Sequence, residues 1–265
     1  MWALLHYSFI QNALLSSAFV AIVAAFAGYF LLIRRLTFAG HAISHIGFAG
    51  AAGAVWLGFD PVFGLLLFTI LGGIGIGIWG NVLRERDVTI GIFLTLALSL
   101  GILFLFLYQG YAEQAYSILF GTILGINTQD VFITALLSII VCGLLLVLFR
   151  PLLFASFDAD VAEARGVPVR FLSIMLLLII AVTVSLSVQV VGVLLIFTLL
   201  VGPVAGAMRL TQNPVVTILI AMVLGIFYSW TGILFAALTN LPVSFFIATL
   251  SFGVYLLIRM RELLI

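Results

Sequence analysis

The hydrophobic positions of this chain fall into nine long runs, separated by short breaks that hold most of its charged residues. Each run is close to the length of about 20 residues that a helix needs to cross the hydrocarbon core of a bilayer. The runs cover residues 9–33, 39–57, 62–82, 88–108, 131–148, 171–188, 191–208, 214–230 and 243–258. This pattern predicts an all-α, polytopic membrane protein of about eight to nine transmembrane helices. Residues 1–265 are then expected to form a single transmembrane domain.

The polar breaks predict how the chain is oriented. If the nine runs alternate across the membrane, all ten basic residues, every one an Arg, fall on one side. The opposite loops hold Asp60, Glu113 and Asp130 as their only charges. Because cytoplasmic loops of membrane proteins are enriched in basic residues, the arginine side is predicted to be cytoplasmic. The N-terminus is then expected outside and the C-terminus inside.

One apolar segment, residues 113–126, is too short for this scheme. We interpret it as a re-entrant or surface helix on the outer side, since such segments are tolerated where protein covers their backbone. If it crossed the membrane instead, the upstream helices would reverse and four arginines would lie outside, against the positive-inside rule.

Composition narrows the class further. The chain is 65% hydrophobic and 7% charged, with a mean hydropathy of +1.42. These values exclude a soluble globular protein, and a formal net charge of +1 gives no support for nucleic-acid binding. The single cysteine, Cys142, leaves no disulfide and no cysteine metal cluster within the chain.

Two imidazoles stand in the second run, at His41 and His45, among Gly, Ala and a single Ser. Their spacing places both rings on one face of a helix, one turn apart, where the nitrogens can share a divalent cation. They are the only ionisable side chains clearly inside a predicted span, and such residues indicate a functional site. Two ligands make a weak site, which would suit an ion that must also leave. The alternative is two packing histidines, each hydrogen-bonded to a carbonyl or to Ser44.

The longest hydrophilic connection, residues 156–170, lies on the predicted cytoplasmic side. Either of two aspartates near its start can cap a short helix, and the second stands at capping-box spacing from a glutamate. A glycine then offers a left-handed end to that helix, and a proline prevents its continuation. We expect a short cytoplasmic coupling helix that docks a soluble partner, with an ordinary solvated linker as the alternative. The residues of this docking loop are Asp158, Asp160, Ala162, Glu163, Gly166 and Pro168.

Glycine and proline mark two further features of the predicted helices. Gly202 and Pro203 interrupt the seventh run, where a proline removes one backbone hydrogen bond and bends the helix. The bend is either a hinge or a tolerated kink. In the third run, Gly73 and Gly77 have the G-x-x-x-G spacing that permits close contact between membrane helices.

Several segments, in order along nearly the whole chain, resemble the membrane permease subunit of bacterial metal-ion ABC importers, the group serving zinc, manganese and iron(II) uptake. The matching residues are Arg34 and Arg35; Gly40, Ala42, Ser44 and His45; Leu119 to Gly125; Phe157, Asp158, Ala162 and Gly166 to Pro168; Val190 to Leu195; Gly202 to Thr211; and Leu241 to Ser244. Taken together and in order, these short motifs are specific.

The resemblance implies a multi-pass protein of the bacterial plasma (inner) membrane, surrounded by lipid. Two copies would form the transmembrane core, a separate cytoplasmic ATP-binding subunit would dock on the loop, and an extracytoplasmic metal-binding protein would deliver the ion. ATP-driven alternating access would then move the metal inward. The chain itself would be no enzyme and would hold no permanent cofactor, its metal being cargo.

The resemblance also bears on the cargo. In the family, the position of His41 is commonly Asp, whereas His45 matches directly. Because a second imidazole is a softer ligand than a carboxylate, this departure favours zinc over manganese or iron(II).

Two competing functions are weaker. A stand-alone secondary metal transporter usually keeps acidic groups at membrane depth, and no predicted span holds one in its core. An intramembrane metalloprotease would need a motif such as H-E-x-x-H, which the sequence lacks.

Overall fold

The computed structural model describes residues 7–82, 86–108, 125–239 and 241–264. Over these residues the chain forms ten helices and no strand. In chain order they are α1 (Ser8–Ile33), α2 (Thr37–Leu57), α3 (Pro61–Val82), α4 (Arg86–Leu107), α6 (Thr128–Phe157), α7 (Ala159–Ala164), α8 (Val169–Val191), α9 (Val193–Leu210), α10 (Pro214–Thr239) and α11 (Val243–Leu264). The all-α prediction is confirmed, and each of the nine hydrophobic runs coincides with one long helix.

Two helices, α6 and α10, extend furthest beyond the runs that predicted them. The fifth run was expected to stop before Arg150, but α6 continues through Pro151 to Phe157. A proline removes a single hydrogen bond from a ladder, and neighbouring groups in a membrane helix can compensate for that loss. Similarly, α10 continues past Trp230 to Thr239. Thr231 and Gly232 ended the predicted hydrophobic run, but they do not end the helix.

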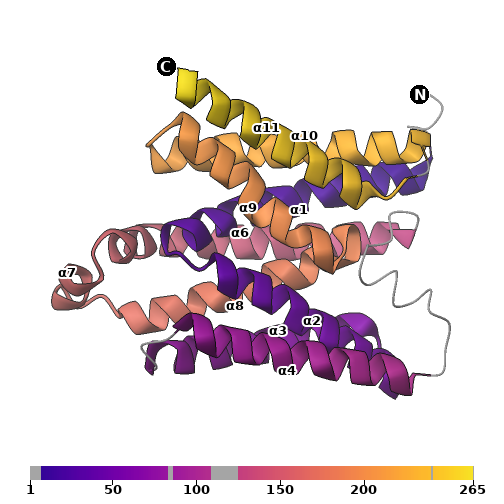
Figure 1. Cartoon of the computed structure of the whole chain (residues 1–265), viewed down its shortest axis with the longest axis horizontal. Helices are drawn as coiled ribbons and strands as arrows, with labels where there is room; N and C mark the ends of the chain where they lie inside the picture. The colour runs from indigo at the N-terminus through magenta and orange to yellow at the C-terminus, as the bar shows by residue number, and fades with distance from the viewer. Residues whose placement is uncertain (1–6, 83–85, 109–124, 240, 265) are drawn as a thin grey trace.

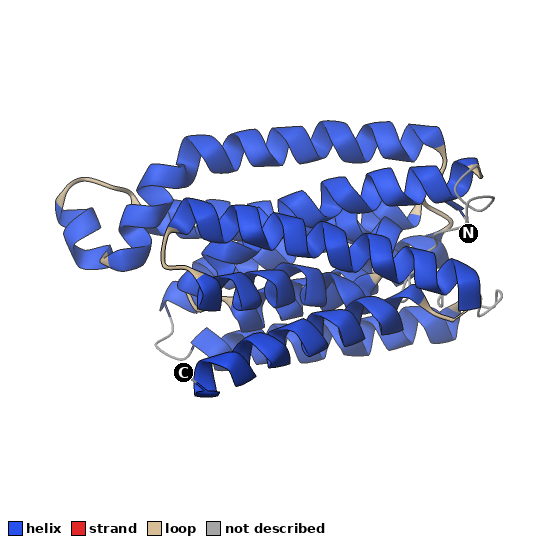
Figure 2. Ribbon diagram, turned by 90° about the horizontal axis from the view of Figure 1, so that it is seen from above, coloured by secondary structure: helices blue, strands red, loops and turns tan. Residues whose placement is uncertain are grey.

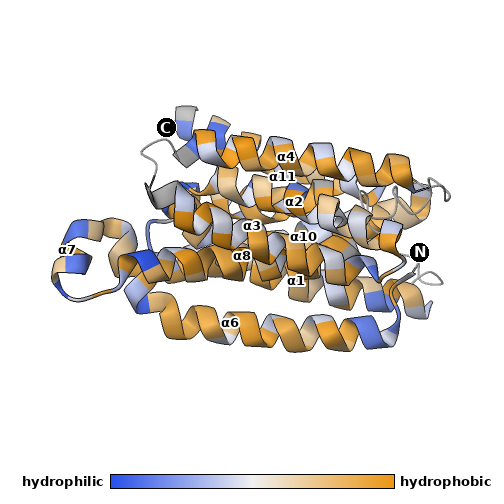
Figure 3. Ribbon diagram, turned by 90° about the horizontal axis from the view of Figure 1, so that it is seen from below, coloured by the Kyte–Doolittle hydropathy of each residue, from blue (hydrophilic) through white to orange (hydrophobic). Residues whose placement is uncertain are grey.

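The long helices lie side by side along one direction, and α7 projects from one end of the bundle (Figures 1 and 2). The end of α11 lies at that same end, whereas α1 begins at the other (Figure 1). Helix α1 is central, since it packs against α6, α8, α9 and α10. Hydrophobic residues cover the length of the bundle, and hydrophilic residues gather at its ends and on α7 (Figure 3). This distribution is typical of a protein whose sides face lipid.

Seven of the described helices are long and apolar enough to cross a membrane, namely α1, α3, α4, α6, α8, α10 and α11. Helix α9 qualifies only as a shorter apolar helix over Leu195–Leu210. Helix α2 has the length, but its histidines and glycines lower its hydropathy. The polytopic architecture is therefore established. The expected outer segment, residues 113–126, lies outside the described residues except for its last two.

Glycines hold α2 tightly against α3. A Cβ atom built on Gly50 would lie 2.2 Å from the carbonyl oxygen of Gly64, and one built on Gly64 would lie 2.1 Å from that of Gly50. The two backbones therefore touch, as small residues at membrane-helix crossings permit. The contact predicted at Gly73 and Gly77 is also present, because both face α8. The first contact fixes α2 against α3, and the second fixes α3 against α8.

Candidate functional site

The two predicted metal ligands lie side by side on α2. The ring centroids of His41 and His45 are 4.6 Å apart, with an interplanar angle of 79°. The ring of Phe197, on α9, lies 5.0 Å from that of His41 at 70°. By helix rise alone, the two histidines stand about 6 and 12 Å along α2 from its first residue. Both are half-buried, so the pair is shielded by α9 without being sealed.

The imidazoles are not engaged in packing hydrogen bonds. Among the described residues, neither ring donates or accepts one, and the Ser44 hydroxyl donates instead to the carbonyl of Gly40, at 3.0 Å. The hydrogen bonds to a carbonyl or to Ser44 that the packing alternative expected are absent among the described residues, and the metal role of the pair stays a prediction. No third His, Cys, Asp or Glu joins the pair within the described part of the chain. One copy offers two ligands, which is a weak site for a divalent ion.

The loop between α6 and α8 forms the predicted short helix, α7. The Asp158 carboxylate accepts a hydrogen bond from the backbone N–H of Val161, at 3.0 Å, and so caps its start. At its end Gly166 has φ +82°. The Gly166 N–H donates to the carbonyl of Glu163 at 2.9 Å, and the Val167 N–H donates to that of Ala162 at 3.0 Å. This pair of bonds is a Schellman motif, so the chain itself closes both ends of α7.

The structure decides between the two aspartates proposed as the cap. Asp158 is the cap, whereas Asp160 lies in the first turn, where its negative charge favours the helix dipole. Ala162 is the buried residue of α7, and Glu163 and Pro168 are exposed. The exposed apolar residues Phe157, Val161 and Phe171 surround the loop. Together these features give α7 an accessible mixed surface.

The predicted bend residues lie inside α9, which runs through Pro203 without a break. A Cβ atom on Gly202 would lie 2.0 Å from the Ser251 hydroxyl oxygen on α11. Gly202 therefore has a packing role, since it lets α9 and α11 approach closely. Whether Pro203 also acts as a hinge stays a prediction.

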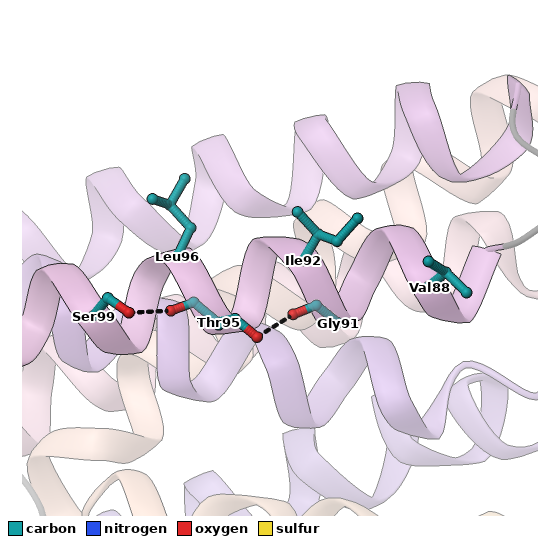
Figure 4. A pocket seen from close by; sticks show the side chains of 6 residues that line it. All are labelled: Val88, Gly91, Ile92, Thr95, Leu96 and Ser99. Atoms are coloured by element: carbon teal, nitrogen blue, oxygen red, sulfur yellow. Dashed lines mark hydrogen bonds between the residues drawn. The ribbon is translucent and has the colours of Figure 1, made fainter.

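A shallow groove of about 530 Å³ lies on the outer face of α4 (Figure 4). Its polar side chains bond within their own helix. Thr95 donates to the carbonyl of Gly91 and Ser99 to that of Thr95, each at 2.9 Å. The remaining lining is Val88, Ile92 and Leu96. The groove lining holds no His, Cys, Asp or Glu, which separates it from the histidine pair.

Sequence reasoning missed two residues near these sites. Phe197 is one of 24 phenylalanines, and nothing in its surroundings marked it as the neighbour of His41. Arg34 was read only as an orientation signal and a family match. In the structure its Nε donates to the Ser156 hydroxyl at 2.9 Å, and its Nη1 donates to the Ser173 hydroxyl at 3.0 Å. The available signal in the sequence was the position of Arg34, a charged residue directly after the apolar run 9–33.

Comparisons with known proteins agree with these features. The model of the ABC 3 transport family matches residues 6–262. The manganese transport system membrane protein MntC of Listeria monocytogenes is 33% identical over 239 residues, covering 90% of this chain and 85% of that protein. A probable metal transport system membrane protein of Treponema pallidum is 30% identical, covering 96% of each chain.

A solved structure has the same fold. PsaBC from Streptococcus pneumoniae, in complex with Fab, matches with a TM-score of 0.86 and 30% sequence identity over 96% of this chain and 92% of that one. The matches confirm the resemblance seen in the sequence motifs, and with it the expectation of a transport subunit that is not an enzyme. By the extent of the family match and the identity of its relatives, this chain belongs to the ABC 3 transport family.

Proposed function

We propose that this chain is the permease subunit of an ABC importer that moves manganese into a bacterial cell, with His41 and His45 contacting the ion in transit. The observation that carries the proposal is the imidazole pair, whose ring centroids are 4.6 Å apart on a helix held inside the bundle. Neutral imidazole nitrogens can replace part of an ion's water, and without such ligands a charge crossing the apolar core costs many kcal/mol.

The choice of manganese departs from the ligand argument. Two imidazoles favour zinc by chemical preference. However, MntC of Listeria monocytogenes and the permease ScaB of Streptococcus parasanguinis, at 33% and 31% identity, are both named for manganese. These names give zinc no support. A weak two-ligand contact in the pathway leaves selectivity to the protein that delivers the ion.

The membrane topology belongs to the same proposal. All nine long helices cross the membrane, α2 and α9 included, because the neighbouring helices cover their less apolar residues. Helix α4 ends and α6 begins at the same end of the bundle, which agrees with alternating crossings (Figure 1). By the positive-inside rule the α7 end is cytoplasmic, the N-terminus is outside and the C-terminus is inside.

The proposed importer complex uses different parts of this chain for its different contacts. Two copies of the chain form the translocation core, so that a second histidine pair can complete the coordination that one copy lacks. The ATP-binding subunit docks on α7, whose exposed face includes Val161. An extracytoplasmic metal-binding protein delivers the ion at the opposite end. ATP binding and hydrolysis then rock the two permeases between outward-open and inward-open states.

The ligand role can be tested by uptake of Mn²⁺ into proteoliposomes that hold the permease with its ATP-binding subunit, with the extracytoplasmic metal-binding protein supplied outside. We expect His45→Ala to lower uptake about tenfold or more, as loss of metal-site groups typically does. The matched control is Ser44→Ala on the same helix, which removes only a bond to its own backbone. Equal uptake by the two variants would refute the ligand role. The same assay with Zn²⁺ and Fe²⁺ compares the uptake of the three metal ions.

The docking role can be tested by co-purification. Val161→Glu places a charge on the exposed face of α7 and should release the ATP-binding subunit. Val215→Glu is the control, because this valine is also exposed and lies in the first turn of a different helix, α10. If the wild-type chain purified alone as an active transporter, the importer assembly itself would be wrong.

A further inference from the structure

Arg34 links the two segments that flank the α7 loop, the end of α6 and the start of α8. Its Nε donates to Ser156 in the last turn of α6, and its Nη1 donates to Ser173 near the start of α8. These two serines stand on either side of α7. Each serine donates its own proton to the carbonyl four residues earlier in its helix, that of Leu152 or of Val169. Their oxygens are thereby oriented to accept from the guanidinium.

The planar guanidinium is suited to this geometry. Its donors point along fixed directions, so one side chain can hold two acceptors at a set separation. The side chain is half-buried, and it comes from the residue that ends α1. Arg34 therefore links the end of α6 and the start of α8 to the C-terminal end of the central helix α1.

The same residue begins the connection to the histidine helix. Arg35 has φ +56° and is the only non-glycine residue with a positive φ in the described part of the chain. The Arg35 N–H donates to the carbonyl of Leu32 at 3.0 Å, and the Leu36 N–H donates to that of Leu31 at 2.8 Å. This Schellman turn resembles those at Gly58 and Gly166 but places an arginine where glycine is preferred. Backbone strain of this kind is concentrated at functional positions.

The turn is also packed against the first turn of α2. A Cβ atom on Gly40 would lie 2.4 Å from the Leu31 Cδ1 atom. The end of α1 therefore packs directly against the start of α2. His41 directly follows Gly40, so a short path of packed residues leads from Arg34 to the histidine pair.

We propose that Arg34 is a positioning residue that transmits movement of the α7 loop to the histidine pair, through Ser156, Ser173 and the strained turn at Arg35. The inference rests on the proposed function, since it takes α7 to be the element that the ATP-binding subunit moves. Discrete elements linked by hydrogen bonds and close packing can carry such coupling. We call the two hydrogen bonds from Arg34 to Ser156 and Ser173 the clamp. Loss of the clamp should leave ATP hydrolysis intact and reduce the number of metal ions moved per ATP.

The test uses the whole complex in proteoliposomes, with Mn²⁺ uptake and phosphate release measured together. The double variant Ser156→Ala/Ser173→Ala keeps Arg34 and removes the two hydroxyl acceptors, together with the bond of each serine to its own helix. We expect unchanged association with the ATP-binding subunit, unchanged hydrolysis, and about fivefold less Mn²⁺ per ATP, within the usual range of coupling effects. Arg34→Lys should give an intermediate ratio of Mn²⁺ to ATP. A lysine ammonium can keep one hydroxyl contact but lacks the fixed pair of N–H donors that lets a guanidinium hold both serines.

The matched control is Ser99→Ala on α4. Ser99 also donates to the carbonyl four residues earlier, but no arginine contacts it within the described residues. If the double variant had the same Mn²⁺ to ATP ratio as this control, the clamp would have no coupling role. Loss of the ATP-binding subunit from the double variant would likewise overturn the proposal, because the serines would then serve docking. Uptake by the wild type without ATP would instead refute the proposed function.

Discussion

Helices α4 and α8 have the same mean hydropathy in their most apolar stretch, yet they occupy opposite environments. In that stretch 67% of the α8 residues are buried inside the protein, against 17% of the α4 residues. Among the described residues, α8 packs against α1, α2, α3, α6 and α9, whereas the main neighbours of α4 are α2 and α3. Lipid and protein interior are equally apolar, so hydropathy identifies a membrane helix without telling which of the two it faces.

Hydroxyl groups distinguish the two helices better than hydropathy does. Thr183, Ser185 and Ser187 of α8 are all buried. Ser185 bonds to Thr69 of α3 through a 2.8 Å contact between the two hydroxyl oxygens. On α4, Thr95 and Ser99 are exposed and bond to their own helix. Hydroxyl residues therefore join two helices at Ser185, whereas at Thr95 and Ser99 they lie on an exposed helix face and bond within their own helix.

The strongest test of this contrast exchanges a small hydroxyl for a large side chain on each helix. Ser185→Leu removes the bond to Thr69 and overfills a packed site, at a cost of about 1–3 kcal/mol for the overpacking alone. Ser99→Leu adds an apolar side chain to a helix face that is exposed and already largely apolar. We expect the first variant to lose most of its folded protein and the second to lose none, as measured by size-exclusion chromatography after heating. Equal melting temperatures would contradict the assignment of α8 to the interior.

A milder test adds one methyl group. A Cβ atom at Gly77 of α3 would lie 3.0 Å from the Ile174 Cγ1 atom on α8, whereas one at Gly91 of α4 meets nothing within 4 Å. Gly91→Ala should stabilise the protein by about 0.5–1 kcal/mol through helix propensity. In Gly77→Ala the crowding against α8 should cancel or exceed that gain. Thermal unfolding in one detergent measures both, and a larger gain at Gly77 would show that α3 and α8 are less tightly packed than described.

The smallest expected effect isolates the hydrogen bond itself. Thr69→Val keeps the shape of the side chain and removes its bond to Ser185, which should cost about 0.6 kcal/mol, the average for interhelical bonds in a membrane protein. Thr95→Val on α4 removes only a bond within the helix and should have less effect. A double-mutant cycle with Ser185→Ala gives the coupling energy directly, and a value of zero would mean that the two hydroxyls do not interact.

The sequence predicted the helices well and their neighbours poorly. Spans of about 20 apolar residues follow from bilayer thickness, so all nine long helices were anticipated. Their ends were less certain, since α6 runs through Pro151. That α8 lies inside and α4 outside could not be inferred, because their hydropathy is the same.

In the candidate sites, contacts between residues close in sequence were predicted, and contacts between residues distant in sequence were not. His41 and His45 are four residues apart, so helix geometry alone brought their rings together. The cap and the left-handed end of α7 also depend on neighbouring residues, and spacing predicted both in outline. Phe197 and the serine partners of Arg34 are more than a hundred residues from the side chains they contact. Only tertiary structure can provide such pairs.

Helix α7 has a consequence for the thermodynamics of association. Asp158 and Gly166 close its two ends with bonds internal to the loop, so a partner meets a surface that is already ordered. Little of the interaction free energy is then spent on the loss of conformational entropy, which a disordered segment would incur on binding. Binding at α7 should therefore show the small heat-capacity change of a rigid-body contact. An ATP-binding subunit could then dissociate and rebind without the loop having to refold each time.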